Sequence, residues 1–137
     1  MKLINYANAH MALTVLSKAQ LPVSNAYAVY KLRRDIAPKA DFFVAREREI
    51  ISKYGAKRND GSIDIRDGKV AILGDTEAER ADNLAAYNRE RDALCNIDEN
   101  EVLCKPVIRL PADIRITPEM IEAIEAVAVI EVDGDAE

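Results

Sequence analysis

The chain has 137 residues and a mass of 15.2 kDa, which is the size of one domain with a single modest core. Hydrophobic residues make up 49% of it and charged residues 31%, a balance that excludes a disordered chain and is typical of a folded protein. No apolar run has the length of a secretory signal or a membrane span, so we expect a cytoplasmic protein that does not contact a membrane.

The formal net charge of −5 is unevenly distributed along the chain. Residues 31–58 carry a net charge of +5, and residues 98–137 carry a net charge of −8. A basic segment of this kind can indicate a polyanionic partner. We favour the alternative in which the acidic end lies near the basic segment, within one molecule or between subunits, since no other feature indicates nucleic acid.

The first expected helix falls within residues 1–20. One apolar face has spacings of three and four residues and is predicted to face the core: Met11, Ala12, Val15, Leu16 and Ala19. His10 is the only histidine, so it has no histidine partner for a metal site, and we assign it to the helix surface. Pro22 indicates a link after this helix, and Ser24 is expected to cap the next one.

The rest of the fold is organised around a long helix predicted over residues 24–54. Two heptad rows form one continuous apolar stripe, the first made of Val29, Ile36, Phe43 and Ile50, the second of Tyr30, Ala37, Val44 and Ile51. Both rows keep their phase across Pro38, so we predict one kinked helix or two nearly collinear helices. Gly55 is the expected stop, in the left-handed conformation that glycine adopts readily.

A β-hairpin is predicted over residues 62–73, because Asp67-Gly68 lies between two alternating segments and indicates a two-residue type I′ turn. The register set by this turn places four apolar side chains on one face, in the pairs Ile65 with Val70 and Ile63 with Ile72. An isolated hairpin is marginal in water. The apolar face is therefore expected to pack either within its own subunit or on another chain.

Three more segments complete the expected fold. A helix over residues 77–94, capped by Thr76 or Asp75, is predicted to turn four apolar side chains inward: Ala81, Leu84, Ala85 and Leu94. Residues 102–110 are predicted to be extended and interrupted by Pro106. A last helix is expected over residues 118–129, with Thr117 as its cap, before a frayed acidic tail over residues 131–137.

Together these elements predict a single domain, residues 1–137, of the α+β class. It is predominantly helical, with one long helix packed with two or three shorter helices and a small β-hairpin. Cys95 and Cys104 are the only cysteines, and in a reducing compartment we interpret them as free thiols on or near the core, with a disulfide as the minor alternative.

Pro22-Val23-Ser24 leads into the long helix, and Tyr54-Gly55-Ala56-Lys57 ends it before the Asp60-Gly61 and Asp67-Gly68 turns and a charged helix. In these motifs, and in the order of its elements, the chain resembles a family of small uncharacterised proteins of phages and prophages of Gram-positive bacteria. The resemblance implies a phage-encoded accessory or assembly protein that acts in the cytoplasm of the bacterial host, and it implies no catalytic residues.

The sequence contains no Gly-rich phosphate loop, no G-x-S-x-G, no H-E-x-x-H and no cysteine–histidine cluster. We therefore expect no enzymatic activity, no metal and no cofactor. The favoured hypothesis is a module that binds a phage or host protein as an assembly factor, a chaperone or an inhibitor of a host defence protein, and that can also form a homo-oligomer. The candidate interaction surface comprises Arg33, Arg34, Arg46, Arg48, Ile63, Ile65, Val70 and Ile72.

The alternative hypothesis is a nucleic-acid-binding accessory protein that uses the basic segment, residues 31–58. It ranks lower because the aromatic side chains Phe42, Phe43 and Tyr54 are expected to follow the buried stripe. A surface that stacks nucleobases would instead interleave its aromatics with the arginines.

Overall fold

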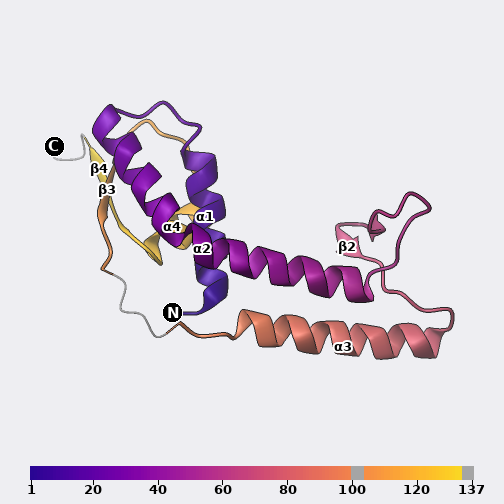
Figure 1. Ribbon diagram of the computed structural model, residues 1–137. Coiled ribbons are helices and arrows are strands. Elements are labelled where there is room, and N and C mark those ends of the chain that lie inside the picture. The colour runs from indigo at the N-terminus through magenta and orange to yellow at the C-terminus, as the bar shows by residue number, and fades with distance from the viewer. Residues whose placement is uncertain (100–103, 134–137) are drawn as a thin grey trace.

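The computed structural model describes residues 1–99 and 104–133 and confirms the predicted α+β, predominantly helical fold (Figure 1). The elements in chain order are α1 (Leu3–Leu16), α2 (Val23–Tyr54), β1 (Ile65–Arg66), β2 (Lys69–Val70), α3 (Glu77–Cys95), β3 (Val107–Pro111), α4 (Pro118–Glu125) and β4 (Val129–Asp133). The first half of α2 lies with α1, α4 and the β3–β4 pair in a body, and its second half runs beside α3 in an arm (Figure 1). The β1–β2 hairpin lies at the far end of this arm.

α2 is one continuous helix of 32 residues with Pro38 inside it. It changes direction at its middle (Figure 1), as expected for a proline that removes one backbone hydrogen bond and crowds the preceding turn. The prediction of a single kinked helix is therefore confirmed. The predicted Ser24 cap is wrong, because the helix begins one residue earlier and its N-cap is Pro22, which has no side-chain hydrogen bond to offer.

The first heptad row on α2 is confirmed, and the second is wrong only at Tyr30, since Ala37, Val44 and Ile51 are half-buried like Ile50. Three members of the first row are buried, and Ile50 is half-buried. Tyr30, from the second row, is instead 54% exposed. Leu32 and Ala40 complete the buried stripe, whose members follow one another at steps of three or four residues.

Gly55 ends α2 as predicted, but for a different reason. Its backbone is extended, with φ −79° and ψ 138°, and is not left-handed. A Cβ atom at this position would lie 2.6 Å from the Ile51 carbonyl oxygen and 3.1 Å from Val70 Cγ1. Glycine is needed here because a Cβ would collide with the last turn of α2, and the hairpin side chain of Val70 leaves it little room to move.

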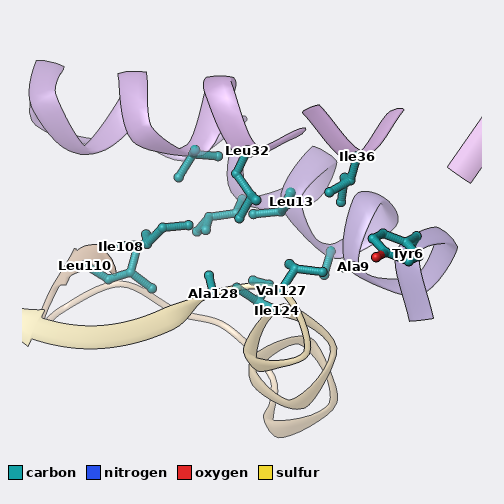
Figure 2. Close-up of a cluster of buried hydrophobic side chains, with 13 residues drawn as sticks. Tyr6, Ala9, Leu13, Leu32, Ile36, Ile108, Leu110, Ile124, Val127 and Ala128 are labelled. Carbon is teal, nitrogen blue, oxygen red and sulfur yellow. The ribbon is translucent and has the colours of Figure 1, made fainter. Parts of the chain in front are cut away.

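The core of the body lies between α2 on one side and α4 on the other, with α1 and β3 closing it (Figure 2). Its buried members are Tyr6, Ala9, Ala12, Leu13, Leu16, Val29, Leu32, Ile36, Ile108, Leu110, Ile124, Val127 and Ala128. Most are aliphatic or alanine, and each fully buried Leu, Ile or Val stabilises the fold by about 1.5–3 kcal/mol.

A second, smaller cluster joins the arm to the body. It contains Leu3 and Ala7 of α1, Phe43 of α2 and Leu94 of α3. Backbone hydrogen bonds support the joint, since the Leu3 N–H donates to the Ile97 carbonyl at 2.8 Å just after α3. The arm is thus anchored where α2 leaves the body and where α3 returns to it.

The hairpin has the predicted turn. Asp67 and Gly68 both have positive φ, 53° and 76°, as a type I′ turn requires, and Ile65 pairs with Val70. The predicted cross-strand pair of Ile63 with Ile72 is wrong.

At Ile63 and Ile72 the two sides of the hairpin are separated by the residues that follow α2. Ile63 bridges to Lys57, and Ile72 bridges to Gly55. Between them, the Ala56 N–H donates to the Ala71 carbonyl at 2.7 Å.

The inward faces predicted for the first and third helices are wrong in part. Met11 is 68% exposed and Val15 is 50% exposed, because α1 turns a neighbouring set inward at the same spacings: Leu3, Tyr6, Ala7, Ala9, Ala12, Leu13 and Leu16. In α3 the predicted members Ala81, Leu84 and Ala85 are exposed, and only Leu94 is buried. α3 touches the rest of the molecule along one side only, so most of its surface faces solvent.

The C-terminal part contains a strand pair that the sequence did not predict. α4 is capped by Thr117, whose Oγ1 accepts from the Met120 N–H at 3.2 Å, and it ends at Glu125 rather than at residue 129. Residues 129–133 form β4, which pairs in parallel with β3, so the predicted frayed tail is wrong for residues 131–133. Of the other predicted segments, residues 102–103 and 134–137 lie outside the described residues.

The two cysteines are free, as predicted. Cys95 is half-buried and packs against the second cluster, whereas Cys104 is exposed. Only Cys95 is therefore near the core.

Candidate functional site

The four arginines of the candidate surface lie along α2 but do not share one face. Arg33 and Arg34 are adjacent residues on the body half, and Arg46 and Arg48 lie on the arm half about 200° apart around the helix. Three have partners in the chain: Arg33 donates to Ser17 Oγ at 2.9 Å, Arg34 reaches Asp35 at 3.3 Å and Arg46 reaches Glu49 at 2.7 Å.

The four apolar hairpin residues of the candidate surface lie at the far end of the arm, away from Arg33 and Arg34 (Figure 1). Ile65 is exposed, and Ile63, Val70 and Ile72 are half-buried. Val70 and Ile63 lie against Gly55 at the end of α2. The eight predicted residues are therefore not gathered into one surface, and their role in binding stays a prediction.

A groove between α1 and α4 is the first of two surfaces that were not among the predicted interaction residues. Its volume is about 690 Å³. Its apolar lining comes from Met11 and Val15 of α1 and from Met120 and Ala123 of α4, and its lining also includes Asn5, Asn8, Glu119 and Glu122. We call this surface the α1–α4 groove.

The second surface is a row of exposed side chains on the first half of α2. Val23, Tyr27 and Tyr30 are exposed, and the two tyrosine rings stack with their centroids 6.2 Å apart. Lys31 Nζ lies 5.2 Å from the Tyr27 ring centroid, and the Arg34 guanidinium lies 5.7 Å from that of Tyr30. We call these five residues the α2 ridge, and it has the Tyr and Arg composition that is enriched at protein interfaces.

In the arm, α2 and α3 are joined in part by polar side chains. Lys53 Nζ lies 3.2 Å from Glu90 Oε1, and Arg91 Nη2 lies 3.1 Å from Glu47 Oε2. Hydrogen bonding from Tyr54, followed by the nearby Lys53, lowers the pKa of the Glu90 carboxyl below its ordinary value. Exposed pairs of this kind contribute little to stability. The arm therefore depends on its few apolar contacts.

The shape of the molecule leaves much surface uncovered. The chain exposes 9335 Å², whereas a compact monomer of this mass exposes about 7,100 Å². The arm projects from the body (Figure 1), since α3 and the hairpin are not wrapped around it. Surface of this kind is available to another chain.

Within residues 1–99 and 104–133, no group of three or more His, Cys, Asp or Glu side chains is placed to hold a metal ion. In the same part of the chain, none of the helices combines the length and apolar character needed to cross a membrane. Comparison of the chain with known protein families, curated proteins and solved structures found no match.

The sequence held a signal for both surfaces. Val23, Tyr27, Tyr30 and Arg34 recur at steps of four, three and four residues, which marks a helix face opposite to the buried stripe. Met11 and Val15 were recognised as one face of a helix, but the pattern does not say whether such a face meets the core or the solvent.

Proposed function

We propose that the chain is a phage- or prophage-encoded accessory protein that acts through protein–protein contacts, in the cytoplasm of the bacterial host, and not by catalysis. The observation that carries this proposal is the α1–α4 groove, in which Met11 and Val15 are exposed beside Met120. Methionine-lined grooves between helices suit the apolar face of an amphipathic helix, because the flexible thioether side chain adapts to its partner.

The phage assignment rests on the resemblance carried by Pro22-Val23-Ser24, Tyr54-Gly55-Ala56-Lys57 and the two Asp-Gly turns. It leaves three roles for experiments to distinguish: an assembly factor, a chaperone for a structural protein and an inhibitor of a host defence protein. All three need a surface that holds another polypeptide, and the α1–α4 groove supplies one.

The experiment is a capture assay with the tagged chain on beads and a nuclease-treated bacterial lysate that is supplied with an untagged copy of the chain. Wild type is compared with Met11→Glu, which places a charge in the groove, and with Leu73→Glu, an exposed apolar position outside it. We expect a phage or host protein, or the untagged copy, to be recovered by wild type and Leu73→Glu and lost with Met11→Glu. Recovery that does not depend on Met11 would refute the groove as the binding surface.

A second candidate function is binding of single-stranded nucleic acid through the basic segment, residues 31–58. The observation that favours it is the stack of Tyr27 and Tyr30 beside Lys31 and Arg34, because exposed aromatics next to cations can stack on nucleobases.

Nucleic-acid binding stays second because cations of the basic segment are already paired with carboxylates in Arg34–Asp35, Arg46–Glu49, Lys53–Glu90 and Arg58–Asp64. Titration with a labelled oligonucleotide tests it, since binding through phosphates weakens steeply as salt rises. No binding at low salt would eliminate this candidate.

A further inference from the structure

We infer that the occupant of the α1–α4 groove is the α2 ridge of a second copy of the same chain. This inference rests on the proposed function, since it names the partner that the groove receives. It commits to head-to-tail self-association in which each copy offers a ridge to one neighbour and a groove to another.

The ridge has the form of a helix that docks in a groove. Val23, Tyr27 and Tyr30 occupy positions i, i+4 and i+7 of α2, the spacing at which a helix presents anchors to a groove. Val23 is 86% exposed and both tyrosines are more than half exposed, so none of the three anchors is needed by the core of its own chain.

The charges of the two surfaces are complementary. Glu119 and Glu122 line the groove, and within the described residues neither makes an ion pair. The ridge brings Lys31 and Arg34 beside its tyrosines. Docking would therefore set Lys31 against these carboxylates at the edge of an apolar contact, while Arg34 keeps its contact with Asp35 at 3.3 Å. Complementary charge of this kind selects partner and register.

The dimensions of the two surfaces also match. Val23 to Arg34 spans about 17 Å of helix, and Asn5 to Val15, the length of α1 that lines the groove, spans about 15 Å. Met120 and Ala123 of α4 form the apolar part of the facing wall, which Glu119 and Glu122 complete.

The ridge and the groove lie on different sides of one body. The core separates α2 from α4, with Leu32 and Ile36 on one side of the cluster and Ile124 on the other (Figure 2). The ridge lies on the side of α2 that faces away from this core. A chain therefore cannot fill its own groove, and a contact between unlike surfaces produces rings or open chains rather than a closed dimer.

A mixing experiment with two surface variants tests the inference. Met11→Glu disables the groove and leaves the ridge, and Tyr30→Glu disables the ridge and leaves the groove. Both positions are more than half exposed, so both variants are expected to keep the wild-type circular dichroism spectrum. Val15→Glu and Tyr27→Glu are the second variants of each kind if one of the first pair does not fold.

Sedimentation over a range of protein concentrations is the readout. We expect the wild-type mass to rise with concentration beyond a dimer, and each variant alone to stay monomeric because its contact is weakened at least about tenfold. An equimolar mixture of the two variants should form a 1:1 dimer and stop there, since only one ridge and one groove remain. Leu73→Glu should associate like wild type, and raised salt should weaken every contact.

Three results would overturn the inference: a wild type that stays monomeric, a single variant that still associates, or a mixture that stays monomeric. These results leave the proposed function standing if the capture assay recovers a phage or host protein through Met11. A chain that neither associates nor captures any protein would refute both.

Discussion

Phe43 and Phe42 are adjacent in α2, but the structure gives them opposite roles. Phe43 is 4% exposed in the cluster that joins the arm to the body, whereas Phe42 is 46% exposed and lies beside Arg46, whose guanidinium is 5.1 Å from its ring centroid. Substitution of each by alanine therefore removes the same atoms from two environments. We expect Phe43→Ala to be far more destabilising than Phe42→Ala.

The magnitude follows from burial. Truncation of Phe43 to alanine withdraws roughly 100 Å² of apolar surface from the core, or about 2.5 kcal/mol. A residual cavity of roughly 60 Å³ adds about 1.5 kcal/mol, because α1, α2 and α3 are held apart by the rest of their packing. The sum is about 4 kcal/mol, within the range of about 3–5 kcal/mol seen for buried Phe→Ala substitutions. Phe42→Ala opens no cavity and removes a half-exposed ring, so its cost is about 1 kcal/mol.

Urea unfolding followed by circular dichroism measures both variants against wild type. Hydrogen exchange adds a local readout, since loss of the joint should raise exchange in α3, residues 77–95, more than in α1. Equal losses of stability for the two variants, or a greater loss for Phe42→Ala, would refute the assignment of Phe43 to the joint.

Three further predictions concern the arm. Gly55→Ala should lower the free energy of unfolding by about 1–3 kcal/mol because its Cβ meets the Ile51 carbonyl at 2.6 Å, and a stabilised variant in urea unfolding would contradict this. Thr76→Ala should lower the free energy of unfolding by about 1 kcal/mol, since Thr76 Oγ1 accepts from the Glu79 N–H at 3.1 Å. An unchanged free energy of unfolding would contradict a stabilising cap at Thr76. The folded-state pKa of Glu90 is lowered, so its contribution to stability is present above its ordinary pKa and is lost as pH falls through the folded value. The melting temperature of Glu90→Gln should therefore decrease less than that of wild type as the pH falls below that ordinary pKa. The same decrease in both proteins would contradict the lowered pKa of Glu90.

The parts of the fold that were predicted correctly are those that local patterns determine. Asp67-Gly68 specifies its turn by backbone conformation alone, and the row that includes Val29 and Phe43 survives Pro38 because a kink preserves the phase of a helix. The β3–β4 pair was missed because its register joins Val107 to Val129, with α4 between the strands. No local pattern specifies which distant segment a short strand will meet, or that its partner will be parallel.

The candidate surface was predicted less well, and for a physical reason. The four arginines all lie on the long helix, but adjacent residues on a helix point about 100° apart. Arg33 and Arg34 therefore contact different partners, Ser17 and Asp35. The apolar pairs of the hairpin predict a face that packs within the subunit or on another chain. In the structure, Val70 and Ile63 of that face pack against Gly55 at the end of α2.

One kind of wrong assignment bears on function: large apolar residues that were predicted to be buried are exposed. Met11, Val15, Tyr30 and Leu84 were all assigned to buried faces from their periodicity, and all four are exposed in the single chain. Periodic apolar residues are maintained at a cost in solubility, since contiguous exposed apolar surface promotes association. These residues have the spacing of a buried face, yet the single chain leaves them exposed. Burial by a second polypeptide would account for both observations. Three of the four lie on the ridge or in the groove, so their exposure in the single chain supports protein–protein contacts at these two surfaces.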